Sequence, residues 1–197
     1  CICNVSANNS SSEKQYRNPT EYGTPKPPTS TFTATGCASA ILTKEKSNIK
    51  IESVTIGKAV DYGVKDVYNM GAAMAPSASY TISKHLADLN RSPDYYDLIL
   101  TGDLGMYGKK ILKELIKKEH NIDLKDNYED CGCLLYDLKK QDVKAGASGP
   151  TSSALVTFSY IIDEMKKGNI KRVLLVATGA LMSPTMMNQK LTIPSIS

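Results

Sequence analysis

Two short stretches of the chain consist of apolar residues with no polar residue between them. They are residues 98–100 (Leu-Ile-Leu) and residues 173–176 (Val-Leu-Leu-Val). A strand covered by helices on both faces has this pattern, whereas a half-exposed strand alternates apolar and polar residues. We therefore predict two buried parallel strands here, and a third short strand over residues 133–136.

Other segments have apolar residues three or four positions apart, which is the spacing of an amphipathic helix. After the first strand, apolar residues occupy positions 104, 107, 111, 112, 115 and 116, and lysines occupy the other side. The same spacing predicts a helix over residues 152–165, and one over residues 78–89 with Pro76 in its first turn. Helices that alternate with buried strands predict the α/β class, with a mixed sheet and helices packed on it.

The amino-terminal part of the chain has a different pattern. Residues 1–30 are polar and rich in turn-forming residues, which predicts an irregular arm. Residues 31–42 and 49–56 are rich in β-branched and alternating apolar residues, which predicts an antiparallel hairpin. We therefore divide the chain into an arm, residues 1–30, and one α/β domain, residues 31–197.

Composition excludes several classes of protein. The net charge is +4 and no basic run is interleaved with aromatic residues, so nucleic acid is not an expected partner. No apolar run is long enough to span a membrane, and no signal peptide opens the chain. Five cysteines cannot form a complete set of disulfides, and their spacing does not match a zinc site, so we expect reduced thiols and no metal.

Three loops of small residues, at 71–76, 102–108 and 146–152, lie next to predicted strands or helices. If they meet at one edge of the sheet, their backbone N–H groups can accept an anion. Asp103 either caps the following helix or contacts a ligand, and the two roles are compatible. The loops lack the lysine of a P-loop and the glycines of a dinucleotide fingerprint.

No nucleophile, base and orienting group can be recognised together in the sequence. His85 lies at the flank of an apolar stripe and His120 at a helix end, where packing and the helix dipole are the expected roles. No cysteine stands between a strand and a helix N-terminus, the position that lowers a thiol pKa.

Several longer runs of residues resemble one known family, in the same order along the chain. These runs are residues 19–23 (PTEYG), 69–71 (NMG), 73–76 (AMAP), 95–99 (YYDLI), 101–105 (TGDLG), 130–132 (DCG), 145–150 (AGASGP) and 176–181 (VATGAL). They resemble the stage V sporulation protein AD family of endospore-forming bacteria, over essentially the whole chain. That resemblance implies a thiolase-like fold of two similar α/β halves, and this chain resembles the carboxyl-terminal half, so we expect it to be part of a longer protein.

The resemblance also implies that the site binds a ligand and has lost catalysis. Thiolase-like enzymes take a histidine and an asparagine, or a second histidine, from this half, but Gly102-Asp103 and residues 147–149 stand at those positions. Members of the family bind dipicolinic acid, a planar pyridine dicarboxylate, and serve its uptake into the developing spore. The residues that we predict to contact it are Gly102, Asp103, Leu104, Gly105, Ser148, Gly149, Thr151 and Met74, and no cofactor is implied.

The resemblance further implies partners and a location. The partners are the absent amino-terminal half and other membrane proteins of the stage V A transport complex. A homodimer is a further alternative that the sequence leaves undecided. The location is the cytoplasmic side of the forespore or spore inner membrane, as a peripheral protein. Two alternatives to ligand binding stay open as well: an acyltransferase with an unusual base, and a scaffold for the dipicolinate transport complex.

Overall fold

A three-stranded parallel sheet lies at the centre of the computed structural model, which describes residues 1–7 and 26–197. Its middle strand, β4 (Leu98–Thr101), lies between β5 (Tyr128–Asp130) and β7 (Val173–Val176). Thr101 pairs with Asp130 on one side and with Val176 on the other, so all three strands end at the same edge. β4 and β7 are the two strands predicted from the apolar runs, but the predicted burial is incomplete in β7, where Leu175 is 44% exposed.

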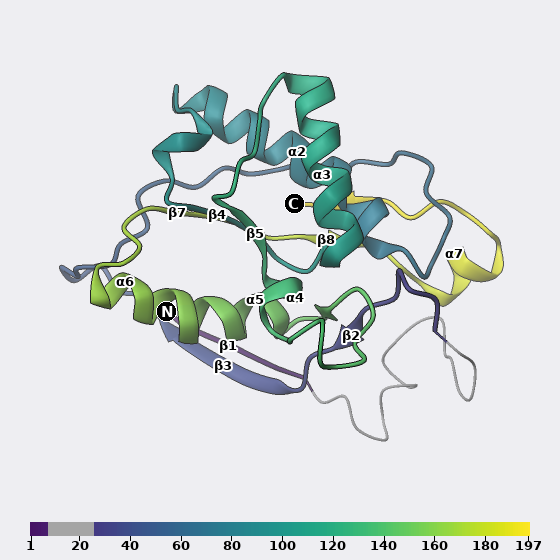
Figure 1. Cartoon of the computed structure of the whole chain (residues 1–197), viewed down its shortest axis with the longest axis horizontal. Helices are drawn as coiled ribbons and strands as arrows, with labels where there is room; N and C mark the ends of the chain where they lie inside the picture. The colour runs from purple at the N-terminus through teal and green to yellow at the C-terminus, as the bar shows by residue number, and fades with distance from the viewer. Residues whose placement is uncertain (8–25) are drawn as a thin grey trace.

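Helices cover both faces of this sheet, which confirms the α/β class (Figure 1). α2 (Met70–Asp88) and α3 (Gly105–His120) lie on one face. The other face carries α5 (Ser152–Leu155), a π-helical turn η2 (Val156–Ile161) and α6 (Ile162–Lys167), which follow one another without a break.

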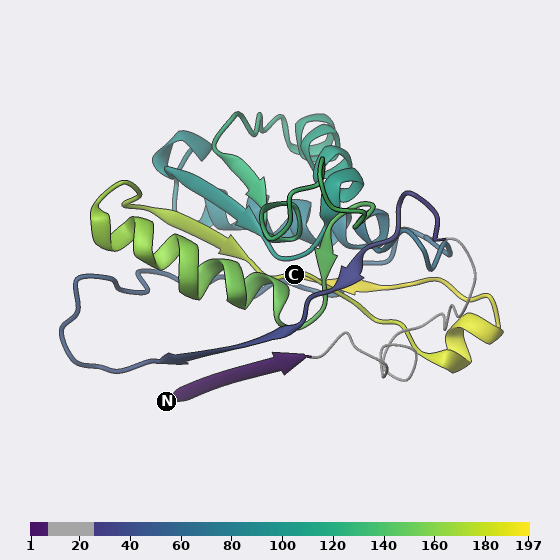
Figure 2. The same ribbon diagram turned by 60° about the horizontal axis from the view of Figure 1, so that its bottom comes forward.

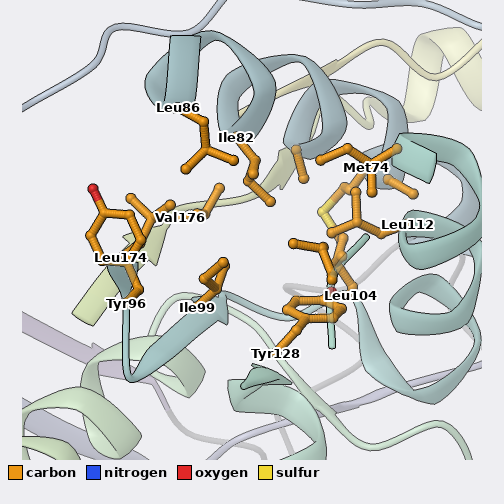
Figure 3. Packing of buried hydrophobic residues seen from close by; sticks show 14 residues of the cluster. Met74, Ile82, Leu86, Tyr96, Ile99, Leu104, Leu112, Tyr128, Leu174 and Val176 are labelled. Atoms are coloured by element: carbon orange, nitrogen blue, oxygen red, sulfur yellow. The ribbon is translucent and has the colours of Figure 1, made fainter. Parts of the chain in front are cut away.

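Successive residues of β4 pack into two hydrophobic cores, one on each face of the sheet. Ile99 packs with Met74, Leu112 and other apolar side chains of α2 and α3, and Figure 3 shows these side chains around it. Leu100 packs on the opposite face with Cys131, Val156 and Ile161. Both are completely buried, which explains why the strand shows no polar alternation.

Helix α2 begins earlier than its sequence pattern predicts. The side chain of Asn69 accepts a hydrogen bond from the N–H of Ala72 at 3.2 Å and caps the helix, and Pro76 lies inside the helix instead of in its first turn. Small residues let most of this helix lie buried, and its last two residues are exposed. Its Gly71 faces Gly108 of α3 so closely that a Cβ added to Gly108 would lie 2.6 Å from the Cα of Gly71.

The predicted hairpin of residues 31–42 and 49–56 is wrong. β3 (Gly36–Ile41) pairs antiparallel with β1 (Ile2–Ala7), the two strands that lie side by side in Figure 2. The short β2 (Phe32–Thr33) pairs in parallel with β6 (Ala147–Ser148), and residues 49–56 form no strand. The prediction that residues 1–30 form an irregular arm is wrong for residues 2–7, which form β1. Residues 8–25 of that arm lie outside the described residues.

The third predicted strand, residues 133–136, is also wrong. The strand next to β4 is β5, and the residues that follow it form a short helix, α4 (Cys131–Leu134). The remaining elements are the 3-10 turn η1 (Pro93–Tyr95), β8 (Gly179–Ala180), α7 (Pro184–Asn188) and β9 (Ser195–Ile196), with β8 and β9 antiparallel. Among the residues that the structure describes, no helix combines the length and the apolar character that a membrane span requires.

Candidate functional site

Two of the three predicted loops, residues 102–108 and 146–152, meet at the edge of the sheet where the three parallel strands end. The third, residues 71–76, is wrong, because these residues belong to helix α2. Gly102 and Asp103 follow β4, Thr178 follows β7, and Asp130 is the last residue of β5. Ligands of open α/β sheets bind outside the carboxyl ends of the strands, because helix N-termini and flexible loops gather there. The candidate site is built on this edge.

Asp130, and not Asp103, caps helix α3. Its two carboxylate oxygens accept hydrogen bonds from the N–H groups of Leu104, at 2.9 Å, and Gly105, at 3.0 Å. The next amide, that of Met106, donates to the carbonyl of Ala145 at 2.8 Å. The first amides of α3 therefore already have acceptors, supplied by two other segments of the chain.

Asp130 is completely buried, and its carboxyl also accepts a hydrogen bond of 2.7 Å from the hydroxyl of Thr101. That hydroxyl lies 3.0 Å from the phenol oxygen of Tyr128. Burial raises the pKa of Asp130 above its usual range, and the hydrogen bonds from Thr101, Leu104 and Gly105 oppose that rise. Burial raises the pKa of Tyr128 as well, so this phenol stays neutral.

Asp103 joins three loops. One of its carboxylate oxygens accepts from the hydroxyl of Thr178 at 2.8 Å, and the other accepts from the N–H of Gly149 at 3.1 Å. The N–H of Asp103 in turn donates to the Thr178 hydroxyl oxygen at 3.1 Å. We call these three residues the Asp103 junction. It corrects the expectation that Asp103 caps the helix that follows it, because a residue from β5 performs that function.

Two glycines make this close approach possible. A Cβ on Gly102 would lie 2.7 Å from the hydroxyl oxygen of Thr178, a distance that real Cβ contacts do not reach. Gly149 has φ +95°, a conformation that strains any residue with a Cβ, and its Cβ would lie 3.2 Å from Thr33.

The structure brings seven of the eight predicted ligand residues to this edge, but buries most of them. Asp103 and Gly149 are partly exposed, whereas Gly102, Leu104, Gly105, Ser148 and Thr151 are buried. The hydroxyl of Thr151 donates to the carbonyl of Ala34 at 2.8 Å. Met74 is the exception, because it lies in the core between α2 and α3, beside Leu104 and Leu112 (Figure 3).

Neither histidine belongs to the site. His85 is buried in α2, where its Nδ1 lies 2.7 Å from the hydroxyl of Thr55 and its Nε2 lies 2.6 Å from that of Tyr96. Tyr96 precedes β4, so this cluster lies at the other end of the strand from Asp103. Burial lowers the pKa of His85, and the positive charge of Arg91 lowers it further. His120 is the last residue of α3.

Cys131 stands directly between β5 and the N-terminus of α4, which corrects the expectation that no cysteine does so, but the cysteines nearest the site are not activated. Burial raises the pKa of Cys131, and it raises that of Cys133 to about 12, with Asp130 adding to both shifts. All five cysteines are free. Within residues 1–7 and 26–197, no group of three or more histidine, cysteine or acidic side chains is arranged to hold a metal ion.

Asp130 and Thr178 were missed as site residues from the sequence. Each lies in one of the runs that carry the family resemblance, residues 130–132 and 176–181. A signal was therefore present, but the structure is needed to show that both side chains bond to the loop after β4.

Comparisons with known proteins agree with that resemblance. A family model described as stage V sporulation protein AD (SpoVAD) matches residues 1–197. A protein of Bacillus subtilis (strain 168) named stage V sporulation protein AD is 47% identical over 193 residues, which cover 98% of this chain and 56% of that protein. The chain thus spans little more than half the length of this curated relative. Because the family model covers every residue and the relative is this similar, the chain belongs to the stage V sporulation protein AD family.

Proposed function

We propose that this chain serves sporulation by binding dipicolinic acid, as part of a protein that takes dipicolinate into the developing spore. The name of the matched family and of the Bacillus subtilis relative supports the sporulation role. The ligand is an inference from the family resemblance, and the chemistry of the edge of the sheet is compatible with it. Backbone N–H groups and hydroxyls gather there, and these groups bind carboxylates.

One observation supports the proposal that the site binds a ligand without catalysing a reaction. The carboxyl ends of β4, β5 and β7 are joined by aspartate, threonine and glycine, and both histidines lie elsewhere. An acyl transfer of the thiolase type needs a base and an oxyanion donor next to the thioester. Burial also keeps the nearby thiols protonated. A site of this composition binds an anion more readily than it activates a nucleophile.

Isothermal titration of dipicolinate into the full-length protein and into the 197-residue chain tests this function, with benzoate as a control that has one carboxylate. We expect saturable binding of dipicolinate to the full-length protein and none of benzoate. Absence of dipicolinate binding would contradict the proposal, and thioester turnover by the full-length protein would favour the acyltransferase instead.

A matched pair of glycine variants tests the position of the site. Gly149 and Gly168 both have positive φ, +95° and +81°, but a Cβ on Gly168 meets no atom within 4 Å. Gly149→Ala and Gly168→Ala therefore introduce similar backbone strain, one in the Asp103 junction and one at the end of α6. We expect Gly149→Ala to weaken binding at least ten-fold and Gly168→Ala to leave it unchanged. Equal affinities would place the ligand elsewhere.

We also propose that the rest of the longer protein covers an apolar surface of this chain. Ile41 of β3 is 75% exposed, and Val54 and Ile56 of the segment that follows are 79% and 87% exposed. Aliphatic side chains of this size are seldom left so open in a folded protein. Higher solubility of the full-length protein than of the 197-residue chain is the expected result. Solubility that falls when these three residues are made polar would contradict it.

The scaffold function and the membrane location are separate proposals. The protein would lie peripherally on the cytoplasmic face of the spore inner membrane and contact the membrane proteins of the dipicolinate transport complex. Sedimentation of the full-length protein with spore inner membranes, with and without those proteins, tests both. Sedimentation that depends on them supports the scaffold, and recovery in the supernatant in both cases contradicts it.

A further inference from the structure

The carboxylate of Asp103 already bonds to groups that a ligand carboxylate would use. One of its oxygens is 3.1 Å from the N–H of Gly149, and the other is 2.8 Å from the Thr178 hydroxyl. A backbone amide and a hydroxyl that converge on one carboxylate form an anion site. In this structure the anion in that site belongs to the chain itself.

No other predicted donor at this edge is as accessible. The amides of Leu104 and Gly105 are buried and bonded to Asp130, and the hydroxyl of Thr151 is buried and bonded to Ala34. Gly149 is partly exposed, and so is Asp103. A ligand that arrives from solvent therefore meets the Gly149 amide first, and finds it occupied.

We propose that Asp103 is an internal competitor of the anionic ligand: its carboxylate occupies the position of a ligand carboxylate on the Gly149 amide, and binding displaces it. The identity of the ligand as a dicarboxylate rests on the proposed function. The competition itself rests on the hydrogen bonds that the Asp103 side chain accepts from Gly149 and Thr178. Asp103 thereby sets the affinity of the site without contributing an attractive contact.

The junction lets the side chain leave without unfolding the loop. The N–H of Asp103 remains bonded to the Thr178 hydroxyl oxygen at 3.1 Å when the carboxylate turns away. Rotation about the χ angles moves the carboxylate of a partly exposed aspartate without a change of backbone. Gly102 places the backbone against Thr178, so the loop keeps its position while the side chain exchanges.

Two substitutions at Asp103 separate its charge from its shape. Asp103→Asn keeps the size of the side chain and one acceptor oxygen but removes the charge, and Asp103→Ala removes the acceptor as well. Asp142→Asn is the matched control, because it changes the net charge by the same amount at a side chain that is 81% exposed in a turn. Dipicolinate affinity would be measured by titration calorimetry in the full-length protein for each variant.

We expect Asp103→Asn to bind dipicolinate roughly ten-fold more tightly than the wild type, as removal of one charge about 5 Å from a dianion in a largely aqueous environment predicts. Asp103→Ala should also bind more tightly, and Asp142→Asn should bind like the wild type. Unchanged or weaker binding by Asp103→Asn, while the wild type binds, would overturn the competition and leave the proposed function intact. Failure of the wild type and both Asp103 variants to bind would overturn the proposed function and the competition together.

Hydrogen exchange at the Gly149 amide gives a readout that does not depend on the ligand. Without ligand, we expect exchange to be faster in Asp103→Ala than in the wild type, because the amide loses its acceptor, and close to the wild type in Asp103→Asn. Exchange that is equally fast in all three proteins would show that Asp103 does not hold this amide, and would overturn the inference.

Discussion

Asp130→Ala tests whether one buried carboxylate holds the start of α3 in place. The substitution removes the acceptor of the Leu104 and Gly105 amides, which lie 2.9 and 3.0 Å from its oxygens, and the acceptor of the Thr101 hydroxyl. Thr101 can turn to the phenol oxygen of Tyr128, 3.0 Å away, but the two amides find no new acceptor. A buried donor without a partner costs about 1–3 kcal/mol, so the two amides cost roughly 2–6 kcal/mol.

A second contribution has the opposite sign. Burial raises the pKa of Asp130, so the folded protein favours its protonated form more than the unfolded chain does. The stability that this group contributes is complete below its unfolded pKa and is lost as the pH rises through its folded pKa. Removing the carboxylate at neutral pH therefore restores part of the loss, and we expect a net destabilisation of about 3 kcal/mol.

Urea unfolding followed by circular dichroism measures this change. In a thermal melt followed in the same way, a loss of about 3 kcal/mol lowers the midpoint of a protein of this size by roughly 6–12 °C. Asp94→Ala is the control, because Asp94 pairs with Lys125 at 3.0 Å on the surface, with a side chain 62% exposed, and should cost less than about 0.5 kcal/mol. Destabilisation by Asp130→Ala of less than about 1 kcal/mol would refute the assignment of Asp130 as the cap of α3.

Three further predictions concern the body of the domain. Gly108→Ala should destabilise the protein by roughly 2 kcal/mol in urea unfolding, although alanine favours helices, because its Cβ would meet the backbone of Gly71 at 2.6 Å; a neutral result would contradict this contact. Leu112→Ala should cost about 2–5 kcal/mol in the same assay, since Leu112 is completely buried in the larger core, and a cost below about 1 kcal/mol would argue against that packing. Burial lowers the pKa of His85, so its contribution to stability is present above the unfolded pKa near 6.5 and is lost as the pH falls through the folded pKa. Urea unfolding at several pH values should therefore show that the wild type loses stability more steeply in acid than His85→Gln does. Parallel pH dependences of the two proteins would contradict this prediction.

Patterns confined to one segment predicted the centre of the fold well. Residues 98–100 form a strand with both faces covered, residues 173–176 form a strand although Leu175 is 44% exposed, and helix α3 follows its apolar spacing closely. The apolar pattern that predicts each of these elements lies within the element itself and does not depend on a distant partner. The predicted meeting of residues 102–108 with residues 146–152 was also correct, as the bond between Asp103 and Gly149 shows, whereas the third predicted loop, residues 71–76, is part of α2.

The errors arose where the partner lies far away in the sequence. Gly36–Ile41 pairs with Ile2–Ala7 and not with the following segment, and Phe32–Thr33 pairs with Ala147–Ser148. Alternation of apolar and polar residues identifies an extended segment but does not determine which other strand it pairs with. The capping of α3 by Asp130 is the same kind of error, because the most common cap is local and this one comes from 26 residues away.

The Asp103 junction also has a consequence for how the chain folds. Asp103 is separated from Gly149 by 46 positions and from Thr178 by 75, and β5, α5 and β7 must form around β4 before these loops can meet. Contacts of such long range form slowly, because the entropy of closing large loops must be lost first. A ligand that binds here therefore recognises only chains whose sheet is complete, and by mass action it shifts the population of newly made chains toward that assembled state.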